Sequence, residues 1–268
     1  MDLPFAEAWS QYADVFTRWV HVVAGVLWVG QLFFFNFVNA PAQAGFDAET
    51  KKKVVPELLP RALYFFRYGA LFTWATGLLL LGLVYHLGGL MVTADATSSQ
   101  KAMAFAFSQA AIWFGFFPYD LLFKTPLRKS PLLGALAGLA LFTAVAFGLS
   151  RLLSGRALFI HLGAILGTTM MMNVWMRIWP AQKKIIRGVK ELDPKPGPEV
   201  AELAAERSRH NLYLSVPVLL FMVAPHTFPL AYGDQLNWVF AAVVVAIGWG
   251  GAAFLLGRAK SPAPMKAP

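Results

Sequence analysis

Seven apolar runs, each long enough to cross a lipid bilayer as a helix, constrain this chain more than any other feature. A spanning helix needs roughly 20 mainly apolar residues. Hydrophobic residues make up 57% of the sequence and charged residues 14%, unlike a soluble domain. The sequence therefore predicts an all-α fold, a polytopic membrane bundle of seven transmembrane helices. The expected spans cover residues 14–38, 63–90, 102–123, 131–149, 156–179, 210–231 and 236–257.

The charges between these runs predict the orientation of the chain. Lys and Arg concentrate in three connections, which are expected to be cytoplasmic because basic loops stay inside. The N-terminal tail has no basic residue before Arg18, so we expect the N-terminus outside and the C-terminus inside; Arg151 and Arg156 depart from this pattern. The net charge of +9 largely follows from this asymmetry and does not indicate nucleic-acid binding. The basic connections are 39–62, 124–129 and 181–209.

The chain contains no cysteine, which limits the cofactors it can hold. Without cysteine there is no iron–sulfur cluster and no C-x-x-C-H site for covalent haem. No signal peptide is expected, because the first residues lack a basic region. The loop 181–209 is the only sizeable soluble segment that the pattern predicts.

Four of the five histidines lie within predicted spans and near the same, outer membrane face. At about 1.5 Å per residue, we expect His21 and His161 to lie roughly 8–10 Å below the outer ends of their helices. Imidazoles inside a membrane usually serve a metal or a proton path. His210, the fifth, belongs to the cytoplasmic side. The four outer histidines are His21, His86, His161 and His226.

Histidine spacing also suggests an internal repeat. His21 and His86 are 65 residues apart, as are His161 and His226, and Pro-Ala-Gln follows the first histidine of each pair. The pattern predicts a tandem duplication with an offset of 140 residues, as parallel repeats 14–149 and 156–257 of four and three spans.

The four outer histidines favour haem b, held by neutral imidazoles from facing helices. Copper, or a mixed haem and copper site, uses the same ligands and remains an alternative. A plainer reading is that each imidazole donates to a backbone carbonyl.

A second polar set lies in the cytoplasmic half. Arg67 and Asp120 either form an ion pair that locks helices, or Arg67 holds an anionic substrate while Asp120 or His210 handles protons. Arg18 and Arg177 are expected to snorkel or to contact membrane phospholipid or haem propionates.

Five segments in order resemble the membrane domain of bacterial membrane-bound urate oxidase (urate hydroxylase). They are RWVHV near residue 18, FTWATG near 72, YDLL near 119, PAQKK near 180 and RHNLY with a later H-T-F-P near 209. The resemblance implies an inner-membrane redox protein that oxidises urate and passes electrons to a periplasmic cytochrome c. It marks as functional His21, Arg67, Asp120, Asn173, His210, Asn211 and His226.

The chain departs from that family in two ways. Neither an eighth span nor a fused C-x-x-C-H cytochrome follows, and Gln31 replaces a usual serine while the A-P-H-T-F-P run around His226 is altered. Either the reaction differs from that of the family, or the electron acceptor is a separate subunit. The alternative function is a non-catalytic haem-binding or scaffold subunit of a larger respiratory electron-transfer complex. A plain transporter ranks third, because it needs no shared layer of histidines.

Overall fold

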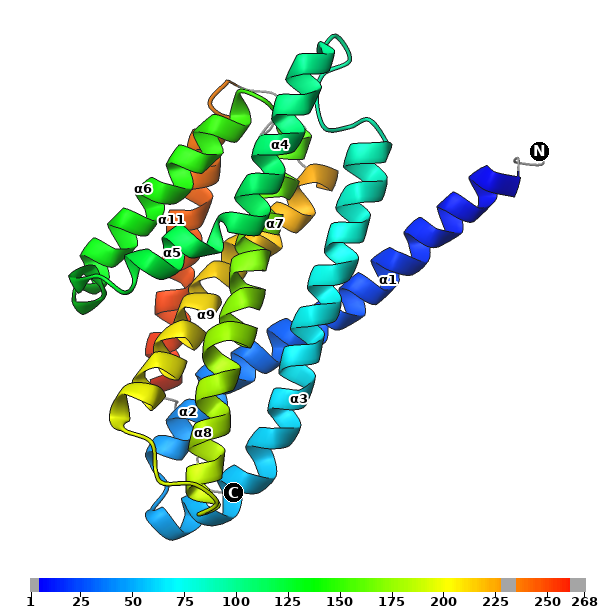
Figure 1. Cartoon of the computed structure of the whole chain (residues 1–268). Helices are drawn as coiled ribbons and strands as arrows, with labels where there is room; N and C mark the ends of the chain where they lie inside the picture. Colours follow the sequence, from blue (N-terminus) through cyan, green and yellow to red (C-terminus); the bar gives the residue numbers. More distant parts are fainter. Residues whose placement is uncertain (1–4, 228–234, 261–268) are drawn as a thin grey trace, which may run out of the picture. The chain divides into compact units, whose positions relative to one another are not determined.

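The computed structural model of the chain describes residues 5–227 and 235–260, and all regular structure in these ranges is helical (Figure 1). Side chains are described for residues 9–224 and 235–260. This confirms the expected all-α class. The α-helices are α1 (Phe5–Phe33), α2 (Ala40–Ala44), α3 (Ala48–Leu80), α4 (Ser98–Phe114), α5 (Phe116–Leu122), α6 (Pro131–Ser150), α7 (Gly155–Asn173), α8 (Trp179–Val189), α9 (Pro198–Thr227) and α11 (Asn237–Lys260).

Three π-helical segments lie within or at the end of long helices. They are η1 (Phe34–Asn39) between α1 and α2, η2 (Leu81–Leu87) after α3, and η4 (Val174–Ile178) between α7 and α8. The first and third directly precede a proline in the next helix, Pro41 and Pro180. Proline lacks an N–H and crowds the carbonyl four residues earlier, and a wider turn relieves this conflict. These two turns begin 140 residues apart, the offset of the predicted repeat, which remains a prediction.

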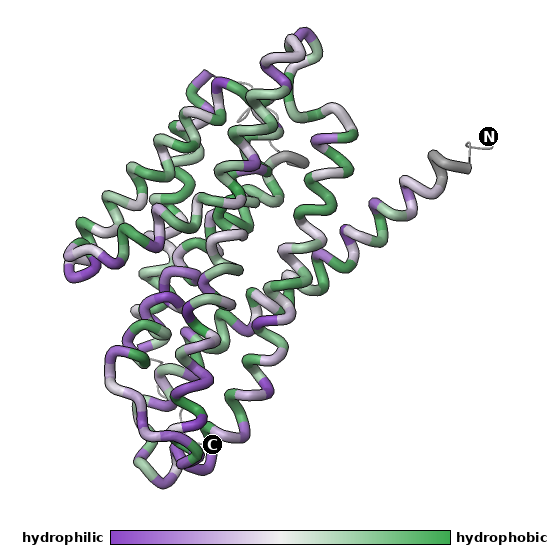
Figure 2. The backbone as a smooth tube through the Cα atoms, viewed as in Figure 1, coloured by the Kyte–Doolittle hydropathy of each residue, from purple (hydrophilic) through white to green (hydrophobic). Residues whose placement is uncertain are grey.

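Five described helices are long and apolar enough to cross a membrane. They support a multi-pass membrane protein, whereas the count of seven and the orientation remain predictions. Figure 2 shows α6 hydrophobic along its length, with hydrophilic residues gathered at the connections from α5 to α6 and from α8 to α9. The five stretches are Trp9–Ala44, Ala48–Leu87, Pro131–Ser150, Gly155–Val189 and Asn237–Lys260.

The expected third and sixth spans differ from the helices observed. The third, 102–123, is divided because α4 ends at Phe114 and α5 begins at Phe116. Pro118 cannot donate to the carbonyl of Phe114, so the straight helix breaks at Gly115. The sixth lies within α9 as far as Thr227, and its last residues, 228–231, fall outside the described residues.

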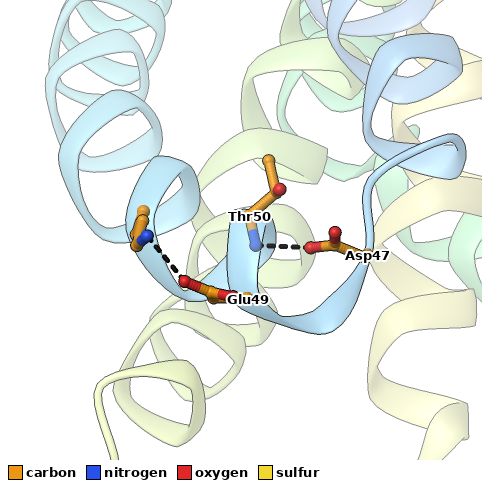
Figure 3. Close-up of polar contacts among 4 residues, drawn as sticks. Asp47, Glu49 and Thr50 are labelled. Atoms are coloured by element: carbon orange, nitrogen blue, oxygen red, sulfur yellow. Dashed lines mark hydrogen bonds and ion pairs between the residues drawn. The ribbon is translucent and has the colours of Figure 1, made fainter.

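Long helices also extend into segments expected to be loops. α3 begins after Asp47, whose carboxylate accepts a hydrogen bond of 2.7 Å from the backbone N–H of Thr50 (Figure 3). This bond caps the helix and is the main reason that the pKa of Asp47 lies below its usual value. α8 and α9 likewise occupy most of the expected loop 181–209, leaving 190–197 between them.

The chain forms two compact units. Unit 1 contains residues 1–22, 72–169 and 217–247, and unit 2 contains 23–71, 170–216 and 248–268. In unit 2, α1 and α3 cross closely at Gly69, where an added Cβ would lie 3.1 Å from the backbone nitrogen of Trp28. A small residue at such a crossing lets two membrane helices approach each other.

Candidate functional site

His161 is the most completely enclosed of the histidines whose side chains are described in unit 1. It lies on α7 with no exposed surface, and its Nδ1 is 2.7 Å from the carbonyl oxygen of Ala157. A carbonyl only accepts, so Nδ1 carries the proton and Nε2 keeps its lone pair. Nε2 is buried and has no hydrogen-bond partner. A backbone bond that fixes the ring and frees the other nitrogen is typical of a metal-ligating histidine.

His86, from η2, is the nearest described imidazole to His161. Their ring centres are 5.8 Å apart, with an angle of 52° between the planes. Two imidazoles on opposite sides of one metal ion, each bonded at about 2.0–2.1 Å, have ring centres roughly 6 Å apart. Tyr85 and Phe105 pack edge-on against His161 and His86 respectively. The ring-centre spacing of the pair is thus close to that of two imidazoles on one metal ion.

Gln109 on α4 holds His86 from the other side, a contact that the sequence reasoning missed. The amide nitrogen of Gln109 is 3.4 Å from Nε2 of His86, and the indole N–H of Trp113 donates to the amide oxygen at 3.2 Å. Since Trp113 donates to the oxygen, the amide N–H faces Nε2 of His86, which accepts; His86 can therefore bind a metal through Nε2 only by giving up this contact. Gln109 and Trp113 are one helical turn apart in an apolar run, and that spacing was the available signal.

His21 lies at a different level. Its Nδ1 is 3.1 Å from the hydroxyl of Thr76, which donates its own hydrogen to the carbonyl of Phe72 at 2.6 Å. Nδ1 of His21 is therefore the donor in this contact. The neighbouring Gly77 precedes His86 by nine residues, or on the order of 13 Å along the helix. α1 begins at Phe5 rather than near residue 14, so His21 lies 16 residues after the helix start instead of seven.

Among the described residues, no three His, Cys, Asp or Glu side chains gather into a metal-holding group. The structure brings together His86 and His161, one from each expected pair. The side chain of His226, near the end of α9, lies outside the described residues. A group of four ligands thus remains a prediction, and the observed arrangement is a pair.

Gly77 leaves room for the imidazole of His21, which gives a test of this contact. In Gly77→Ala the new Cβ would lie 3.0 Å from Cε1 of His21, so the ring must move. Overpacking of this kind costs about 1–3 kcal/mol. We expect a thermal unfolding midpoint in detergent several degrees below that of the unmodified protein. Gly82→Ala is the control, because nothing lies within 4 Å of its added Cβ; equal midpoints for the two variants would contradict the contact.

The expected cytoplasmic set is divided between the two units. Asp120, on α5 of unit 1, is 3% exposed and pairs with Lys124 at 2.8 Å. Arg67 and His210 belong to unit 2, where His210 lies on α9 beside the buried Arg207. The predicted ion pair between Arg67 and Asp120 remains untested, because the two units are described separately.

Aromatic rings surround the guanidinium of Arg67. Its carbon lies 4.1 Å from the ring centre of Trp179 and 4.9 Å from that of Tyr68, with Tyr64 and Trp175 each at 5.9 Å. Trp175 also donates its indole N–H to the carbonyl oxygen of Arg67 at 3.2 Å. We call this group the Arg67 box. The sequence predicted a functional Arg67 but not these neighbours.

Asn173 and Asn211 form a buried amide pair in unit 2. Asn173 donates to the side-chain oxygen of Asn211 at 2.9 Å, and Asn211 donates to the carbonyl of Met170 at 2.9 Å. Both side chains have no exposed surface. Because buried amides need hydrogen-bond partners, these two bonds stabilise the contact between α7 and α9, in addition to any role in a reaction.

Similarity to known proteins covers most of the chain. The family model described as urate oxidase N-terminal matches residues 42–266. The matched region includes Arg67, His86, Asp120 and His161 and begins after His21. Comparisons with curated proteins and with solved structures gave no match.

Proposed function

Because the chain belongs to the urate oxidase N-terminal family, we propose that it is a membrane haem-b oxidoreductase acting on urate or a similar anionic reductant. Electrons leave the protein to a periplasmic cytochrome c. The proposed location is the inner membrane of a bacterium, where several helices cross the lipid. Partner subunits of a respiratory complex are compatible with this role.

One observation carries the haem proposal: the buried, partnerless Nε2 of His161 beside the ring of His86. Both imidazoles come from helices of unit 1, and no carboxylate or thiolate among the described residues joins them. Neutral nitrogen ligands of this kind suit haem iron. When bound, haem b supplies a carrier for one electron at a time. His86 and His161 would hold it, and copper on the same two imidazoles is the alternative.

The chain's own residues would bind the reductant and move its protons. Oxidation of urate with addition of one water releases two electrons and two protons, so two cytochrome c molecules each accept one electron. In this proposal Arg67 holds the anion, while Asp120 and His210 accept protons. Asp120 is suited to proton exchange with the medium, because its partner Lys124 is largely exposed.

Spectroscopy and turnover together test the proposed function. We expect the purified full-length protein to show a haem Soret band, a reduced-minus-oxidised b-type spectrum and iron by elemental analysis. We also expect it to reduce cytochrome c only when urate is added. A protein with neither Soret band nor bound iron contradicts the haem proposal. A normal spectrum without urate-dependent reduction contradicts the enzymatic part and favours the non-catalytic subunit.

A further inference from the structure

The Arg67 box contains a positive charge with no acidic partner in the part of unit 2 that the structure describes. Nε of Arg67 is buried and makes no hydrogen bond. Four aromatic rings lie around its guanidinium. Cation–π contacts offset part of the cost of placing a cation in apolar surroundings, but they do not neutralise it.

A second cation shares the same indole. Nζ of Lys183 lies 5.5 Å from the ring centre of Trp179, which also stacks against Arg67. Two like charges against one ring repel each other, and an anion close to both would offset this repulsion by attracting each of them. Lys183 and Tyr64 are exposed, so a ligand can approach the box from their side.

The geometry of Arg67 limits the shape of that anion. With Trp179 at 4.1 Å from the guanidinium carbon, one face of the group is covered; since Nε is buried, the donors left for a ligand are those of the two Nη groups. Edge donors of a guanidinium pair best with two acceptors in the same plane. A flat ring held there would extend between the aromatic side chains and stack on them.

We propose that Arg67, Trp179 and Lys183 form a binding site for a planar heteroaromatic anion, with Tyr68 and Trp175 as its walls. The inference rests on the proposed function for the identity of the ligand, because urate has this chemistry. It assigns Trp179 and Lys183 as binding residues and Arg67 as the anchor. A phospholipid phosphate would use the same charges, but it has no ring to place against the aromatic walls.

Equilibrium dialysis of labelled urate against the full-length protein in detergent tests the site without any electron acceptor. We expect Arg67→Gln and Arg67→Lys each to weaken urate binding by about tenfold or more, since neither offers paired edge donors. Trp179→Leu should weaken binding as well, whereas Trp179→Phe, which keeps a flat ring, should lose less. Arg61→Gln is the matched control, because this arginine of α3 is exposed and pairs with Glu57; it should bind urate normally.

Three results would overturn the assignment: no urate binding by the unmodified protein, unchanged binding by Arg67→Gln, or equal binding by Trp179→Phe and Trp179→Leu. Competition distinguishes the ligand source. Xanthine, a planar relative, should displace urate; displacement by phosphatidylglycerol at equal concentration and not by xanthine assigns the box to lipid and refutes the proposal. Normal binding with no cytochrome c reduction counts against the proposed function and leaves the site supported.

Discussion

Replacing His161 by alanine should abolish haem loading. The imidazole is fully buried, its Nδ1 is fixed by Ala157, and its Nε2 is the one described histidine nitrogen that is both buried and without a partner. Among the described residues, no further His, Cys, Asp or Glu joins His86 and His161. We expect the Soret band of purified His161→Ala to fall to background. Leu87→Ala is the control, because this side chain adjoins His86 in sequence but is 82% exposed.

Adding imidazole separates ligand loss from misfolding. Alanine leaves a cavity of ring size, so imidazole supplied during haem reconstitution should restore part of the Soret band if the fold persists. His86→Ala should behave like His161→Ala, whereas His21→Ala should retain most of the haem, because His21 lies at another level along α3. Full loading of His161→Ala would refute the pair. Loss of loading in His21→Ala but not in His86→Ala would instead indicate that His21 and His161 are the two ligands.

The sequence predicted the helical class because long apolar runs have few alternatives in a membrane. Helix ends were harder to predict. The first helix begins at Phe5 although its early turns carry polar residues, and the level of His21 is set by its contacts with Thr76 and Gly77 of α3. The break at Gly115 was also missed, although Pro118, three residues later, carried the signal.

The candidate site was predictable by residue type but not by pairing. Histidine spacing marked His86 and His161, together with His21 and His226, as candidate ligands, but equal spacing along the chain does not say which helices become neighbours. Nothing in the sequence distinguishes Gln109 from other polar residues; only the structure shows its amide between His86 and Trp113. The Arg67 box depends on η4, because a π turn changes the direction of the side chains that follow it. Such turns leave little trace in hydrophobic periodicity.

Phe221 holds the core of unit 1 together, and its replacement should cause the largest loss of stability. Its ring is fully buried on α9, stacks on Phe142 of α6 at 6.0 Å and packs against Phe159 of α7 at 5.9 Å. Phe159 in turn contacts Phe240 of α11. One side chain thus joins helices that are far apart in sequence. Phe221→Ala removes both ring contacts and leaves a cavity, at a cost of about 3–5 kcal/mol.

We expect the thermal unfolding midpoint of Phe221→Ala in detergent to fall by on the order of 10 °C. Phe254→Ala makes the same chemical change on α11 at a side chain that is 69% exposed, and its midpoint should stay close to that of the unmodified protein. In lipid or detergent an apolar side chain gains little from leaving water, so the difference between the two variants measures packing rather than transfer. If the two variants have the same thermal unfolding midpoint, the aromatic cluster does not hold α6, α7 and α9 in place. The position of His161, two residues after Phe159, would then need another support.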